Sequence, residues 1–260
     1  MKVNLHTHTT LCGHATGNAE DYVLKAIENG IEVMGFSEHA PFRFPGGYES
    51  GHRVPTAKAQ EYVNTVNYLR EKYKDKIKIY LGFELEYLPL YFNDMYKSLT
   101  DLGAEYLILG QHHIKNEYPN GYYIGMIERS VYDLHEYVNC AIEGMKTGVF
   151  TYLAHPDIIQ VTSDDKAYTC EMTRLCKAAK ATNTPLEINF LGIRDKRFYP
   201  HDKFWKIAGK VGCSVVFGLD AHTADSAAFD PASLEQALQM VKDFKLKLVE
   251  YPEIVNLKNL

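Results

Sequence analysis

The chain has 260 residues, 46% of them apolar and 23% charged, which suits one large α/β barrel or two smaller globular domains. Its formal net charge of −5 argues against a broad basic surface for nucleic acid, and no apolar run is long enough for a membrane span or a secretory signal. The five cysteines form no C-x-x-C pair, which argues against a disulfide framework or a zinc knuckle. We therefore expect one cytoplasmic domain over residues 1–260, and the sequence leaves its oligomeric state open.

Short apolar runs recur along the chain, separated by longer amphipathic stretches. Helical spacing of apolar residues is clearest over 19–30 and 57–76. Strands that alternate with helices indicate a mainly parallel sheet, and about seven such units favour a closed barrel over an open sheet. The predicted strands are 2–5, 32–36, 77–83, 106–110, 150–154, 185–190 and 214–218.

Side chains that can bind a metal follow at least six of these seven runs. In an α/β barrel the carboxyl ends of the strands share one face, which carries the chemistry, so these residues are predicted to converge. In chain order they are His6 and His8, His39, Glu84 and Glu86, the adjacent His112 and His113, His155, and Asp220 and His222.

The spacing of these residues indicates a metal site. Residues i and i+2 of a strand point to the same side, so the members of H-x-H and D-x-H pairs can reach one centre. Neighbours point to opposite sides, so only one of His112 and His113 can face inward. Imidazole with carboxylate suits Zn²⁺, Mn²⁺ or Fe²⁺, and nine donors suggest two or three ions. Besides one of that pair, the donors are His6, His8, His14, His39, Glu84, His155, Asp220 and His222.

Other acidic and histidine side chains are expected to play lesser roles. Glu84 and Glu86 can both face inward, so one of them is predicted to bind metal while the other orients a ligand or the substrate, and Asp157 is expected to act in the same outer layer. His52, His135 and His201 follow no strand run and are not expected to bind metal.

The motifs resemble those of the polymerase-and-histidinol-phosphatase superfamily of metal-dependent phosphoesterases. The matching stretches are H6-T-H8, S37-E-H39-A-P, G82-F-E84, G110-Q-H-H113, A154-H155-P and D220-A-H222, which span about residues 4 to 223. The resemblance implies a distorted (β/α)7 barrel with a trinuclear metal site at the carboxyl ends of its strands. It also selects His113 over His112 and Glu84 over Glu86.

The same resemblance implies how three ions are held. His6, His8, Glu84 and Asp220 would hold one ion, and Glu84 would bridge to a second ion held by His113 and His155. The third ion would be held by His14, His39 and His222. The candidate catalytic residues are Glu84, His113, Asp220 and His222.

Three stretches are similar to the histidinol-phosphatase branch of the superfamily: residues 11–42, GFELEY and LEINFLGIRDKRFYP. This similarity implies hydrolysis of L-histidinol phosphate, a small phosphate ester of histidine biosynthesis, by a metal-bound hydroxide. One alternative is a phosphatase of the same superfamily that acts on phosphotyrosine proteins or small nucleotides. Amidohydrolase-type chemistry and a catalytically silent, metal-stabilised module are weaker alternatives.

Substrate contacts are predicted in two loops. An arginine fork matches phosphate geometry, so Arg194 or Arg197, just beyond the sixth strand, is expected to hold the phosphoryl oxygens. The segment 41–53 is expected to cover the site, with Arg43 and His52 as further substrate contacts. Its aromatic residues Phe42, Phe44 and Tyr48 could pack on the substrate ring, and Glu49 could pair with an ammonium group.

Overall fold

The computed structural model describes residues 1–257. Within that range, one sheet contains eight strands, all neighbouring pairs are parallel, and their spatial order follows the chain. The strands are β1 (Val3–Asn4), β2 (Val33–His39), β3 (Lys78–Leu85), β4 (Tyr106–Leu109), β5 (Phe150–Leu153), β6 (Leu186–Asn189), β7 (Ser214–Gly218) and β8 (Lys247–Leu248).

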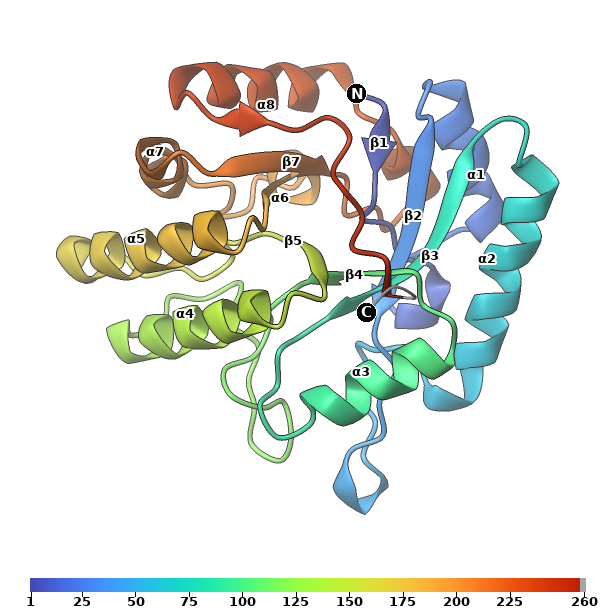
Figure 1. Ribbon diagram of the computed structural model, residues 1–260, viewed down its shortest axis with the longest axis horizontal. Helices are drawn as coiled ribbons and strands as arrows, with labels where there is room; N and C mark the ends of the chain where they lie inside the picture. The colour runs from blue at the N-terminus through green and yellow to red at the C-terminus, as the bar shows by residue number, and fades with distance from the viewer. Residues whose placement is uncertain (258–260) are drawn as a thin grey trace.

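Helices connect the strands and lie around the outside of the sheet (Figure 1). Local capping defines several of their starts; for example, Ser130 accepts from the amide of Asp133 at the start of α4. The helices are α1 (Ala19–Glu28), α2 (Ala59–Tyr73), α3 (Phe92–Asp101), α4 (Val131–Lys146), α5 (Asp165–Ala181), α6 (Phe190–Arg194), α7 (Asp202–Val211) and α8 (Pro231–Asp243). No helix among the described residues is long and apolar enough to cross a bilayer.

The sheet curls until its first strand meets its seventh. Thr7 and Ala221 form a parallel bridge just beyond the ends of β1 and β7. The amide of His8 donates to the carbonyl of Ala221 at 3.0 Å, and the amide of Ala221 donates to the carbonyl of His6 at 3.3 Å. This closure brings His6, His8 and the residues after β7 to the same place.

The predicted α/β class with a parallel sheet is confirmed, and each of the seven predicted runs overlaps a strand. The structure differs at the end of the chain, where Lys247–Leu248 forms an additional short strand beside β7. It also places two helices between β6 and β7, because Asn189 caps the short α6 directly after β6. That short helix holds Leu191 and Arg194 close to the barrel mouth.

The core explains why only one end of the barrel is open. The buried apolar residues form two clusters. The smaller one includes Leu5, Tyr106 and Tyr152, which lie on or next to strands, and the larger one contains most of the apolar residues of the helices. The last described residues then cross the amino ends of the strands, with hydrogen bonds from Val249 to β7 and from Leu257 to the carbonyl before β4 (Figure 1). The carboxyl ends of the strands are left to form a cavity.

Candidate metal centre

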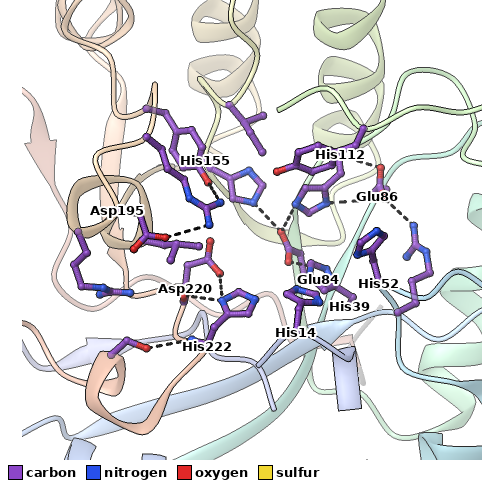
Figure 2. Close-up of a pocket in the computed structure, with 18 of the residues that line it drawn as sticks. His14, His39, His52, Glu84, Glu86, His112, His155, Asp195, Asp220 and His222 are labelled. Carbon is purple, nitrogen blue, oxygen red and sulfur yellow. Dashed lines mark hydrogen bonds and ion pairs between the residues drawn. The ribbon is translucent and has the colours of Figure 1, made fainter. Parts of the chain in front are cut away.

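A cavity of about 790 Å³ opens at the carboxyl ends of the strands, as Figure 2 shows. A cavity of this size is in the usual range for small-molecule sites. His6 and His8 lie beneath it and are fully buried. The predicted residues that line it are His14, His39, His52, Glu84, His113, His155, Arg194, Arg197, Asp220 and His222.

Glu84, in β3, is at the centre of the cluster. Its carboxylate is 2% exposed, and each of its oxygens faces a different set of histidines. Oε2 lies 3.5 Å from His6 Nε2, 3.5 Å from His8 Nε2 and 3.1 Å from His39 Nδ1. Oε1 lies 2.9 Å from His155 Nε2 and 3.5 Å from His112 Nε2. One carboxylate therefore faces two separate groups of nitrogen donors.

Asp220 is the second carboxylate of the cluster and follows β7. Its Oδ1 lies 3.5 Å from His6 Nε2, 3.3 Å from His8 Nε2 and 3.3 Å from His222 Nδ1. The His222 ring stacks on that of His8 with centroids 4.3 Å apart, and the centroid of the His14 ring lies 4.8 Å from that of His222.

The donor atoms gather in groups compact enough for a metal ion. Ligand atoms of His6, His155 and Asp220 all lie within 4.8 Å of one another, as do those of several further groups, three of which contain only proposed donors or His112. These three groups are His6, His8 and Glu84; His39, Glu84 and His112; and His14, His39 and His222.

Several buried atoms of the cluster have no hydrogen-bond partner among residues 1–257. They include His6 Nε2, His8 Nε2, Glu84 Oε2 and His222 Nε2. Buried polar atoms without partners are costly, and a group of them facing one point is what a metal ion would satisfy. The residues present therefore fit divalent metal ions.

The charges of the cluster support the same conclusion. Burial opposes ionisation of Glu84, but His112, His39 and His6 outweigh it and hold the pKa of Glu84 well below its usual value. Burial also lowers the pKa of His112 to about 3 and that of His222 to about 2. Burial thus favours the neutral form of both rings, which is the form in which imidazole binds a metal.

Without a metal, the carboxylates draw protons onto other rings. Burial lowers the pKa of His8, but Asp220 and Glu38 outweigh it and raise this pKa to about 9. The cluster therefore takes up positive charge, as protons or as metal ions.

The structure differs from the expectation that His113 rather than His112 faces the other donors. His112 directs Nε2 to Glu84, and its ring lies 4.8 Å from that of His155. His113 instead directs Nδ1 to Glu86, 3.1 Å away, and its amide donates to the same carboxylate at 2.7 Å. Only one of the two neighbours reaches Glu84, but it is the one that the motif did not select.

Arg194 and Arg197 both reach the cavity wall from the segment after β6. Arg194 donates from Nη2 to the carbonyl of Leu219 at 2.7 Å, and its buried Nη1 has no partner in the described part of the chain. Arg197 lies 3.2 Å from Asp195 and 3.2 Å from the Tyr199 hydroxyl.

The segment 41–53 contributes less than expected. His52 lines the cavity, with its ring 5.9 Å from that of His14. The Arg43 side chain is 63% exposed, does not line the cavity and pairs with Glu49 at 2.7 Å, so the structure does not bring Arg43 to the other predicted site residues.

The structure also does not bring the aromatic residues of this segment to the cavity. Phe42, Phe44 and Tyr48 do not line the cavity; they pack on one another and on Tyr91 and Tyr118 because these rings exclude more water together than over an open cavity.

Sequence reasoning missed a set of buried charged residues around the donors. Glu187 in β6 lies 2.8 Å from His6 Nδ1, and Glu38 in β2 lies 3.5 Å from His8 Nδ1. Arg53 is buried and pairs with Glu86 and Glu117, each at 2.7 Å. The available signal was a charged residue inside an apolar strand run, as in LEIN and GFSEH.

The PHP domain family model matches residues 4–191. Among curated relatives, a probable histidinol-phosphatase of Deinococcus radiodurans is 24% identical over 229 residues, covering 86% of this chain and 87% of the relative. A probable histidinol-phosphatase of Schizosaccharomyces pombe is 26% identical and covers 85% and 81%. The solved histidinol phosphate phosphatase of Lactococcus lactis, complexed with zinc, L-histidinol and phosphate, matches with a TM-score of 0.71 at 20% identity, with 95% of each chain covered. That likeness establishes a shared fold.

Proposed function

The chain belongs to the PHP domain family, and on that premise we propose that it is a metal-dependent phosphomonoesterase that hydrolyses L-histidinol phosphate to L-histidinol and phosphate. The observation that carries this proposal is the presence of Glu84, between two groups of histidines, in the same cavity as two arginines. The names of the curated relatives support the choice of substrate.

The metal ions would be held by three sets of side chains. His6, His8, Glu84 and Asp220 surround one position, and Glu84, His112 and His155 surround another. His14, His39 and His222 form the third set. We propose His112 in place of His113 because only His112 directs a ring nitrogen at Glu84. Bound divalent ions lower the pKa of water and stabilise charge on phosphoryl oxygens.

The side chains of the chain itself bind and orient the ester. Arg194 places an unpaired guanidinium nitrogen at the cavity wall, where an anionic phosphate would satisfy it. Arg197 lies beside it, held by Asp195 and Tyr199. These arginines and the metal donors surround the cavity, so a phosphoryl group between them would contact both. His113, which Glu86 holds away from Glu84, lines the wall and is proposed as a substrate contact rather than a ligand.

The test is phosphate release by protein purified without chelator. L-Histidinol phosphate, phosphotyrosine peptide, p-nitrophenyl phosphate and a mononucleotide are compared, each with and without EDTA. We expect a strong preference for L-histidinol phosphate that EDTA abolishes and added Zn²⁺ or Mn²⁺ restores. EDTA-sensitive turnover of another ester alone would refute the substrate but keep the metal chemistry. Turnover that EDTA leaves unchanged would refute the metal-dependent function.

A further inference from the structure

His6 is held from both sides of its ring. Its Nδ1 lies 2.8 Å from Glu187 Oε1, and its Nε2 faces Glu84 and Asp220 at 3.5 Å with no hydrogen-bond partner among the described residues. Glu187 belongs to β6, whose residues supply none of the proposed metal ligands. It is fully buried, so its carboxylate acts through neighbours rather than through solvent.

The second carboxylate oxygen of Glu187 points away from His6 and is held by other hydrogen bonds. Oε2 accepts from the backbone amide of His155 at 3.0 Å and from Asn189 Nδ2 at 2.9 Å. The same Asn189 nitrogen donates to Asp220 Oδ2 at 3.1 Å. One carboxylate thereby connects three proposed ligands: the ring of His6, the backbone of His155 and, through Asn189, the carboxylate of Asp220.

The neighbouring strand β7 leaves space for the Glu187 carboxylate, because it has a glycine beside it. β7 ends at Gly218, which pairs with Asn189 of β6. A Cβ atom at position 218 would lie 1.7 Å from Glu187 Oε1, far inside van der Waals contact. A larger residue at this position would displace the Glu187 carboxylate from its place beside His6.

We propose that Glu187 is a positioning residue that keeps the proton of His6 on Nδ1 and thereby directs the lone pair of Nε2 to a divalent metal ion. A carboxylate oxygen accepts this hydrogen bond, so the His6 ring donates to Glu187 from Nδ1, and a metal ion would bind at Nε2 in place of a proton. Carboxylate partners of this kind orient metal-binding histidines and strengthen them as ligands. The inference rests on the proposed metal-dependent function.

Replacing Glu187 by glutamine should disturb this arrangement although its shape is preserved. In one amide orientation, the NH₂ group faces the two N–H donors from His155 and Asn189, so a buried donor is left without an acceptor. In the other orientation, the NH₂ group faces His6 Nδ1, which must then accept. The His6 proton moves to Nε2 in that case, and the ring can no longer bind metal through that atom.

The experiment measures metal binding rather than turnover. Metal-free wild type and Glu187→Gln are titrated with Zn²⁺ against a chromophoric chelator and, separately, with Co²⁺ while the visible spectrum is recorded. The matched control is Glu171→Gln, because Glu171 forms a similar carboxylate–imidazole pair with His135, 3.1 Å apart, on the outer helices α5 and α4. Thermal unfolding in chelator reports whether each variant folds without metal.

We expect one Zn²⁺ equivalent of Glu187→Gln to bind about 10- to 100-fold more weakly, with an altered Co²⁺ spectrum, while Glu171→Gln matches wild type. Wild-type Zn²⁺ affinity and an unchanged Co²⁺ spectrum in Glu187→Gln would overturn the proposal. If Glu187→Gln does not fold, Glu187→Asp is used instead, because its shorter side chain keeps the carboxylate but holds it farther from His6. Unchanged Zn²⁺ affinity in Glu187→Asp would also overturn the proposal. Failure of wild type to bind metal would instead refute the proposed function.

Discussion

Gly110→Ala tests whether the position of Glu84 controls the site. Gly110 directly follows β4, beside the Glu84 side chain of β3. A Cβ atom there would lie 1.8 Å from Glu84 Oε1, 2.4 Å from its Cδ and 2.5 Å from its Cγ. Because three consecutive atoms of the side chain overlap with the added methyl group, rotation of the carboxylate alone cannot relieve the contact. The Glu84 side chain must retreat by about 1 Å or more.

The magnitude follows from that displacement. A 1 Å error in a reacting site costs about 100-fold in rate, and overpacking a core costs about 1–3 kcal/mol of stability. We therefore expect kcat/KM for L-histidinol phosphate to fall about 100-fold in Gly110→Ala. For a chain of this size, Tm should fall by no more than roughly 10 °C. Phosphate release, metal content after gel filtration and thermal unfolding are measured on the same preparation.

The control is Gly51→Ala, because Gly51 lies in the segment beside the cavity but a Cβ atom there would meet nothing within 4 Å. Its activity and metal content should equal those of wild type. Wild-type kcat/KM and full metal content in a folded Gly110→Ala protein would refute the central role assigned to Glu84.

Three further predictions follow from the site. His112→Ala should lose bound metal and most activity, whereas His113→Ala should keep its metal and mainly raise KM. Metal analysis and kinetics on both variants test this. Loss of metal from His113→Ala but not from His112→Ala would contradict it. Arg197→Ala should raise KM about 10-fold or more by removing a phosphate contact, whereas Arg43→Ala should match wild type in the same assay. Burial raises the pKa of Asp157 from 3.8 to about 7, so the folded chain holds a proton that the unfolded chain has lost, and stability falls as pH rises through that window. In metal-free protein, Tm of Asp157→Asn should therefore decrease less with rising pH than Tm of wild type, so the substitution should raise Tm more at pH 8 than at pH 4. An equal decrease of Tm with pH in both proteins, measured by thermal unfolding, would contradict this.

The strands and the donors at their ends could be predicted because both depend on local patterns. An apolar run followed by a polar residue marks where a strand passes from the apolar core to the polar barrel mouth, and H-x-H spacing indicates which side chains share a side. Parallel strands in chain order then bring His6, Glu84 and Asp220 together without any further information. The additional strand β8 is only two residues long, too short to give an apolar pattern of its own.

Predictions that depended on side-chain direction outside regular strands were less successful. His112 and His113 lie beyond the end of β4, where the chain no longer alternates regularly, so spacing alone could not decide which ring turns inward. The carboxylate of Glu86 decides it, because it accepts from both backbone amides and from the His113 ring. In the same way, Glu49 holds Arg43 outside the cavity.

The buried carboxylates behind the histidines were hidden for a different reason. Glu38 and Glu187 occur within apolar strand runs, where a single charged residue breaks the pattern without indicating its partner. Their partners are His8, 30 residues from Glu38, and His6, 181 residues from Glu187. The pairing of β1 with β2 brings the first pair together, and the curl of the sheet that joins the ends of β1 and β7 brings the second pair together. A charged residue inside a buried parallel strand costs free energy unless the fold supplies a partner. Such a residue is therefore itself evidence for a buried polar partner elsewhere in the fold, and here both partners are proposed metal ligands.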